Sequence, residues 1–208
     1  DRRTRAMLDT LQERGGLCMG MIRFDQHSGL FANSEAVDDL YGLRYSLELF
    51  RRDDVERVLA SFYGKLAQGL TRDTYIGAEG TGLRPLDEHG RAMFQPPNCA
   101  SNAFFLWMLR CLLVQDWDLD GDGVPETLRL GFATPRAWLA DGAGYAIQAA
   151  PTAFGAVSLR VAARSSQGFV RAEVTAPPRR PGKSFLRIRL PAGRHPGEAR
   201  VGTRELVI

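Results

Sequence analysis

The spacing of apolar residues changes partway along the chain. Up to about residue 126, apolar residues recur every three or four positions, which is typical of amphipathic helices. Residues 53–70 are the clearest case, with Asp53 in the N-cap position of a capping box. Their apolar positions are Val55, Val58, Leu59, Phe62, Tyr63, Leu66, Ala67 and Leu70. Two further helices are predicted over residues 1–14 and 34–50.

Residues 99–115 predict a helix of a different kind. Its residues 103–109 and 111–114 are all apolar, with only Arg110 between the two runs. A helix that is apolar all round is buried all round, and this one is shorter than the roughly 20 residues that a membrane span needs. Before it lies the Gly- and Pro-rich stretch 71–98. We predict a long, packed loop there, of the kind that is usually functional.

From residue 127 onward the period becomes two. Four segments alternate apolar with polar or small residues, and turn residues separate them: 127–132, 157–162, 170–175 and 186–190. This pattern is typical of antiparallel sheets with one buried face, so we predict an antiparallel β-sandwich over 127–208. The parity places several arginines on the solvent side, namely Arg160, Arg171, Arg187 and Arg189.

The charge changes sign at about the same place. Residues 1–126 hold 20 acidic and 14 basic residues, whereas 127–208 hold 4 acidic and 13 basic ones. Such a change indicates two units with different surfaces. The basic strands lack interleaved aromatic residues, so we expect a solvated sheet and no nucleic-acid partner. The opening residues read as a helix already under way. We therefore expect a piece of a longer chain, and the localisation stays open.

Residues 118–126 carry the sharpest local motif, Asp-Leu-Asp-Gly-Asp-Gly-Val-Pro-Glu. Acidic residues at every second position followed by glycine resemble the first half of an EF-hand calcium loop. The candidate ligands are Asp118, Asp120, Asp122 and Glu126. Position 12 of an EF-hand would be Arg129, so the loop is not a complete EF-hand. The predictions are a structural Ca²⁺ site or, equally, an acidic connector.

The stretch 71–98 holds candidate residues for glycoside hydrolysis, which needs two carboxyl groups. Glu79 is the first candidate, because small neighbours would let a ligand approach its carboxylate. Asp87 and Glu88 are weaker candidates, since they also fit a plain polar turn. The candidates for substrate binding are Tyr75, Arg84 and His89. Four further acidic residues have two possible roles. They would either face the same cavity or only cap and solvate the helix that begins at Ser34: Asp25, Glu35, Asp38 and Asp39.

The order of elements resembles the C-terminal end of six-hairpin (α/α)₆ glycosidase-like proteins. In those bacterial proteins a helical toroid is followed by a β-sandwich. The residues that carry the resemblance are the buried helix, then 133–139 (Ala-Thr-Pro-Arg-Ala-Trp-Leu), 147–155 and 186–191. It implies an α+β multidomain chain, with helical hairpins of a partial toroid over 1–126 and a sandwich over 127–208.

These observations predict part of a glycoside hydrolase-like protein that acts on a carbohydrate, with residues 71–98 lining the site. The remainder of its own longer chain would complete the toroid, and no membrane partner is expected. The resemblance matches no catalytic residue by motif, so Glu79 is chosen on local chemistry alone. The alternative is a non-catalytic carbohydrate-binding or structural module, in which Glu79 only holds the loop.

Overall fold

The computed structural model describes residues 2–25, 27, 35–38, 40–87, 90–202 and 204–206, and all structural statements below refer to them. Contacts between residues divide the chain into two compact units, Asp1–Cys111 and Leu112–Ile208. We call them the N-terminal and the C-terminal unit and describe each by itself. This division falls near the end of the apolar helix, before the place where the apolar period and the charge change.

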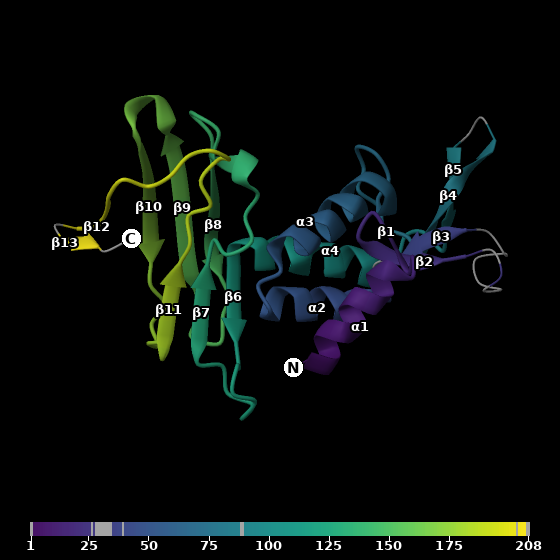
Figure 1. Ribbon diagram of the computed structural model, residues 1–208, viewed down its shortest axis with the longest axis horizontal. Coiled ribbons are helices and arrows are strands. Elements are labelled where there is room, and N and C mark those ends of the chain that lie inside the picture. The colour runs from purple at the N-terminus through teal and green to yellow at the C-terminus, as the bar shows by residue number, and fades with distance from the viewer. Residues whose placement is uncertain are drawn as a thin grey trace. The chain divides into compact units, whose positions relative to one another are not determined.

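The N-terminal unit combines helices with an antiparallel sheet (Figure 1). Its helices are α1 (Arg2–Glu13), α2 (Leu43–Arg51), α3 (Val55–Gly64) with the π-helical turn η2 (Lys65–Gly69), and α4 (Cys99–Leu113), whose last two residues belong to the C-terminal unit. Its strands are β1 (Leu17–Cys18), β2 (Met21–Phe24), β3 (Ala36–Asp38), β4 (Gly80–Asp87) and β5 (Gly90–Phe94). They form one five-stranded sheet in the order β1-β2-β3-β4-β5.

This sheet corrects the predicted (α/α)₆ toroid, and with it the resemblance to six-hairpin glycosidase-like proteins. The described residues of both units together form four α-helices. A sheet occupies much of the part that was expected to form helical hairpins. The expected long loop 71–98 contains the β4–β5 hairpin. Strands β1, β2 and β3 are only two to four residues long. They are too short for an alternation of apolar and polar residues to predict them. Pairing between distant segments forms the sheet instead, as where Ala36 lies opposite Gly82.

Helix α4 is not buried on all sides, although its sequence is apolar all round. Phe104 and Met108 face the core and are 4% and 0% exposed. On the opposite side Leu106 is 62% exposed, and Ala103 is exposed as well. The remaining aromatic residues pack sideways, since Phe105 stacks on Phe62 of α3 with ring centroids 5.1 Å apart. The helix therefore has a buried face and an apolar exposed face.

Helix α3 packs closely against the turn between β1 and β2. The Ser61 hydroxyl donates to the Gly20 carbonyl over 2.6 Å. A Cβ atom at Gly64 would collide with the Met19 carbonyl oxygen, and one at Gly20 would collide with the backbone of Ser61. Both glycines are needed because the two backbones touch without side chains between them.

We expect Gly64→Ala to destabilise the protein by about 1–3 kcal/mol, the usual cost of overpacking. The sign is informative, because alanine is favoured over glycine in an unobstructed helix by about 1 kcal/mol. Urea unfolding followed by circular dichroism measures the change. Gly197→Ala is the control, since nothing lies within 4 Å of a Cβ there. A Gly64→Ala variant as stable as the parent would contradict the close approach.

The C-terminal unit is built mainly of strands (Figure 1). They are β6 (Val114–Trp117), β7 (Thr127–Leu130), β8 (Gly144–Ala150), β9 (Val157–Arg164), β10 (Phe169–Thr175), β11 (Lys183–Leu186), β12 (Ala199–Val201) and β13 (Arg204–Leu206), with the short 3₁₀ turns η3 (Arg136–Leu139) and η4 (Ser165–Gln167). Two three-stranded sheets have the orders β10-β9-β8 and β11-β7-β6, and β12 pairs with β13. Residues of both three-stranded sheets share one hydrophobic core, including Val114, Leu128, Leu159 and Val161.

The predicted all-antiparallel sandwich over 127–208 is also corrected. Strand β11 pairs with β7 in parallel. Strand β6 comes from residues assigned to the end of the apolar helix and to its connector, and it pairs with β7 from the other side. A parallel neighbour must be brought back by a long connection, and the alternating pattern within each strand carries no information on that direction.

Burial reverses the predicted parity near the end of the second sheet. Leu186 was expected inside but is 44% exposed, whereas Arg189 was expected outside and is only 8% exposed. Arg189 Nη1 donates to the Thr134 carbonyl over 3.0 Å. The Arg187 guanidinium lies over the Phe132 ring, 4.0 Å from its centroid. Strand β11 ends at Leu186, so the alternation does not continue and these arginines pack on residues 132–134.

Candidate functional site

The loop between β6 and β7 is a β-hairpin connection built on acidic residues. Trp117 and Thr127 form the last pair of the hairpin, and the Glu126 amide donates to the Trp117 carbonyl over 3.1 Å. Gly121 and Gly123 adopt φ values of 83° and 89°, a region that residues with a Cβ rarely occupy. These two glycines let the chain curl between the acidic residues.

Local hydrogen bonds hold the aspartates of this loop in place. Asp118 accepts two backbone N–H groups, from Gly121 over 2.6 Å and from Gly123 over 2.7 Å. Asp122 Oδ1 accepts from the Val124 amide over 2.7 Å. The Glu126 carboxylate accepts from the Leu119 amide at the other end of the loop. Side chains of both ends are therefore oriented by the backbone of the loop itself.

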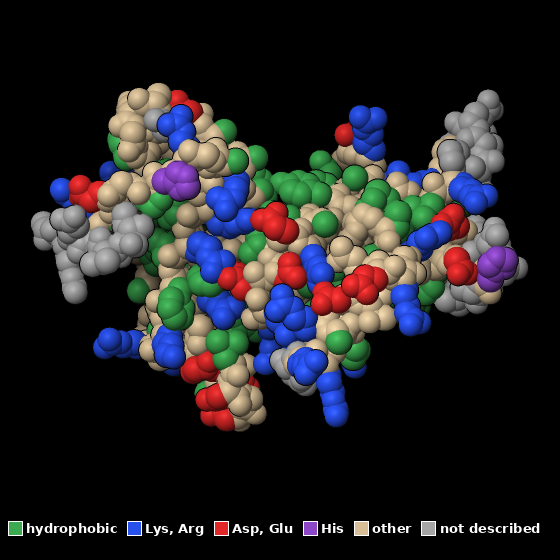
Figure 2. All heavy atoms as spheres, viewed as in Figure 1, with side chains coloured by type: hydrophobic (Ala, Val, Ile, Leu, Met, Phe, Trp, Pro, Cys, Tyr) green, Lys and Arg blue, Asp and Glu red, His purple; other side chains and the backbone are tan. Residues whose placement is uncertain are grey.

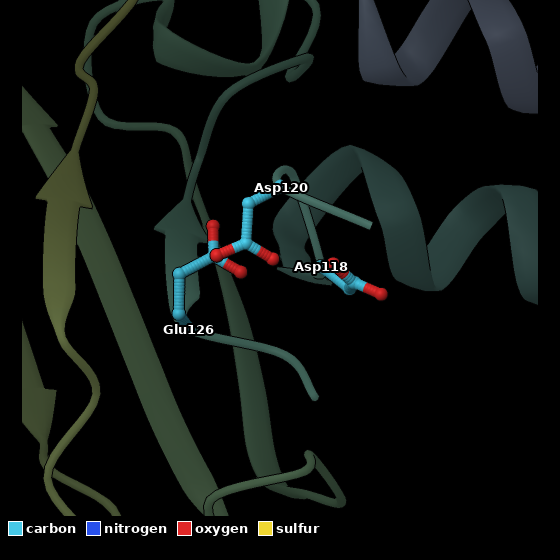
Figure 3. Close-up of side chains that lie close together, drawn as sticks. All are labelled: Asp118, Asp120 and Glu126. Carbon is cyan, nitrogen blue, oxygen red and sulfur yellow. The ribbon is translucent and has the colours of Figure 1, made fainter. Parts of the chain in front are cut away.

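The loop brings three of the four predicted ligands together. One carboxylate oxygen each of Asp118, Asp120 and Glu126 lie within 4.8 Å of one another, and these three could hold a metal ion. In Figure 3 the Asp120 and Glu126 carboxylates point toward each other, with Asp118 beside them. Asp122 does not belong to this group. Figure 2 shows acidic side chains gathered at the end of this hairpin.

Hydrogen bonds favour the ionised form of two of these carboxylates. The Gly121 amide is the main cause of a lowered pKa at Asp118. At Glu126 the pKa is lowered chiefly by the Thr127 hydroxyl, which donates over 2.8 Å, while the charge of Asp118 acts in the opposite direction. Both side chains are only partly exposed. Their burial acts in the opposite direction and raises the pKa, so the lowering comes from the local hydrogen bonds.

A second arrangement of polar side chains surrounds Glu79 in the N-terminal unit. Glu79 is half-buried just before β4 and accepts a hydrogen bond from the Tyr41 hydroxyl over 2.7 Å. The pKa of Tyr41 is raised, mainly by this hydrogen bond and further by the negative charges of Glu79 and Asp38. Tyr41 also packs edge-on against Phe24, with ring centroids 5.7 Å apart. Two carboxylates thus act on one phenol.

Among the described residues, none of the other residues predicted for a carbohydrate site forms a hydrogen bond or an ion pair with Glu79. Tyr75 is 54% exposed, and Arg84 lies beside Glu35, with Arg84 Nε 3.6 Å from Glu35 Oε2. Glu35 also pairs with Arg23. Asp87 ends strand β4, and its side chain lies outside the description. Three predicted residues lie outside the described residues altogether: Asp39, Glu88 and His89.

Two polar residues of the N-terminal unit were not singled out by their sequence. Tyr41 is 38 residues away from Glu79, and no spacing rule connects them. Lys65 is 1% exposed and donates to the Ser101 hydroxyl, which is fully buried. Lys65 stands out in one respect, because this arginine-rich chain has only one other lysine, Lys183.

Comparisons with known proteins add no relatives. No family model, no curated protein and no solved structure matches this chain. None of the helices among the described residues is both long and apolar enough to cross a membrane. The candidate chemistry therefore depends on the residues and geometry described above.

Proposed function

We propose that residues 118–126 bind one Ca²⁺ ion and that the C-terminal unit is a calcium-stabilised structural module. The clustering of Asp118, Asp120 and Glu126 within 4.8 Å carries this proposal. Asp118, Asp120, Asp122 and Glu126 occupy positions 1, 3, 5 and 9 of a calcium loop. The Val124 carbonyl stands at position 7, where such loops use a backbone ligand.

The donor set favours calcium over other metals. All candidate donors are carboxylate or carbonyl oxygens, which suit hard cations, whereas zinc and copper sites use histidine or cysteine. Ca²⁺ accepts six to eight oxygens in irregular geometry, while Mg²⁺ demands a near-ideal octahedron. An exposed, glycine-containing loop fits the more tolerant ion. Because β7 follows directly in place of an exit helix, the site differs from an EF-hand.

The position of Glu126 explains how an ion there would stabilise the sheet. Its side chain belongs to the acidic cluster, and its carbonyl accepts the Lys183 amide over 3.1 Å. Lys183 is the first residue of β11, which pairs in parallel with β7. An ion held by the Glu126 carboxylate would therefore fix the residue from which the β7–β11 pairing begins.

This proposal is tested by titrating CaCl₂ into the metal-stripped protein in a calorimeter. We expect one Ca²⁺ per chain, weaker Mg²⁺ binding, and an affinity about tenfold or more lower in Asp118→Asn, which loses a charged ligand. Asp73→Asn makes the same change of charge in the N-terminal unit, at a residue with φ 66° that asparagine tolerates. Equal calcium affinity in Asp118→Asn and Asp73→Asn would contradict the site.

We propose as a second candidate that the parent protein hydrolyses a carbohydrate at Glu79. The Tyr41–Glu79 hydrogen bond supports it, because it holds the Glu79 carboxylate in place beside an exposed tyrosine. Asp38, whose charge also acts on Tyr41, is the candidate for a second carboxyl group. Release of reducing ends from soluble polysaccharides by the full-length protein tests the proposal. Carbohydrate binding without hydrolysis would favour the non-catalytic module.

A further inference from the structure

Sheet β10-β9-β8 carries a shallow depression of about 330 Å³. Along β9 the side chains of Val157, Leu159, Val161 and Ala163 are buried in the core, so the alternating residues between them point to the other face. Three of those residues line the depression: Arg160, Ala162 and Arg164. Their partners on β8 line it too, since Gly144 lies opposite Ala162 and Ala146 opposite Arg160.

The floor of the depression is made of small residues, and two arginines also line it. Gly144, Ala146 and Ala162 leave the surface of the sheet open to a flat ligand. Arg160 and Arg164 are the charged residues of the lining and are four positions apart on one strand. At 3.2–3.4 Å per residue their Cα atoms are about 13 Å apart. The depression is thus a groove lined by two arginines whose backbone positions are about 13 Å apart.

Both guanidinium groups lack an ionic partner within the described part of the chain. None of the ion pairs there includes Arg160, and the hydrogen bond made by Arg164 goes to the backbone carbonyl of Ala163. Glu173 lies opposite Arg160 on β10, but it is engaged by Arg171, with Arg171 Nε 3.0 Å from Glu173 Oε1. The two arginines are therefore available to an anionic ligand.

We propose that this groove binds an anionic polysaccharide, with carboxylate or sulfate groups on Arg160 and Arg164 and a sugar ring over the small residues between them. Arginine presents its donors in a planar fork that matches such oxyanions. The shallow, open shape suits an extended polymer more than an enclosed small molecule. Single-stranded nucleic acid would stack its bases on aromatic residues, and Phe169 is the one exposed aromatic residue of the three strands as described.

This inference goes beyond the calcium site and does not involve Glu79. It is tested by calorimetry on the whole chain in calcium, with a sulfated oligosaccharide, polygalacturonate, neutral dextran and an oligothymidylate of matched charge as probes. We expect the sulfated or the carboxylated probe to bind most tightly. The double variant Arg160→Ala/Arg164→Ala should lower that affinity about tenfold or more, since each lost contact is a charge-assisted hydrogen bond.

The double variant Arg180→Ala/Arg194→Ala is the matched control. It removes the same charge at exposed positions that do not line the groove, and its affinity should stay within a few-fold of the parent. An equal loss in both double variants would mean that net charge alone attracts the polymer, which overturns the proposal. Tighter binding of the oligothymidylate, equal binding of dextran, or no binding of any anionic saccharide at low salt would overturn it as well.

Discussion

Calcium should raise the melting temperature of the C-terminal unit by about 10–20 °C. A ligand that binds only the folded state contributes about 2.7 kcal/mol at 100 times its dissociation constant. For a domain of 60–100 residues each kcal/mol shifts the melting temperature by about 4–8 °C. Differential scanning calorimetry of metal-stripped protein, with calcium or with chelator, measures the shift. Identical melts in the two conditions would remove the structural role of the ion.

The calcium effect should also depend on pH in a defined direction. The pKa values of Asp118 and Glu126 are lowered from their ordinary 3.8 and 4.5. Groups with a lowered pKa in the folded state contribute stability above the ordinary value, and this contribution is lost as the pH falls through the lowered one. Calcium needs the same ionised carboxylates. The difference in melting temperature between the samples with calcium and with chelator should therefore be largest at neutral pH and disappear below about pH 4. In Asp118→Asn this difference should be small at every pH.

Glu79→Gln should lower the rate of carbohydrate hydrolysis by the full-length protein about 10²–10⁴-fold, the usual contribution of a general acid or base. Loss of a nucleophile would cost more. Glutamine keeps the shape of the side chain and still accepts the Tyr41 hydroxyl, but it cannot ionise. The melting temperature should barely change, because this half-buried side chain lies beside an exposed tyrosine. Initial rates of reducing-end release give the comparison.

Two further variants separate catalysis from structure at Glu79. Tyr41→Phe removes only the donated hydrogen bond and should lower the rate by less than Glu79→Gln does. Glu13→Gln makes the same chemical change at an exposed residue of α1 and should leave the rate unchanged. If Glu79→Gln hydrolyses its substrate within a few-fold of the parent rate, Glu79 is not catalytic. A lowered melting temperature with a proportional loss of activity would indicate that Glu79 only holds the loop.

The acidic loop shows what a contiguous stretch of sequence can determine. Its ligands lie within nine residues, and its geometry depends on neighbours in the chain, such as the bonds from Gly121 and Gly123 to Asp118. Spacing alone predicted four carboxylates in one place, and the structure brings three of them together. Strand β9 belongs to the same class, because a period of two over eight residues specifies which side is buried.

The pairing of the sheets and the burial of single polar side chains depend on segments that are far apart in the chain. Such contacts produce no repeating pattern in the sequence, so the sequence did not predict them. The five-stranded sheet needs β3 to meet β4, strands that are separated by α2, α3 and η2. Its short strands gain their hydrogen bonds only through those partners. Arg189 lies buried where the Thr134 carbonyl accepts a hydrogen bond from it. The same is true of Tyr41 and Glu79, and of Arg160 and Gly144 in the groove. In both places the residues are far apart in the sequence, and only the tertiary structure brings them together.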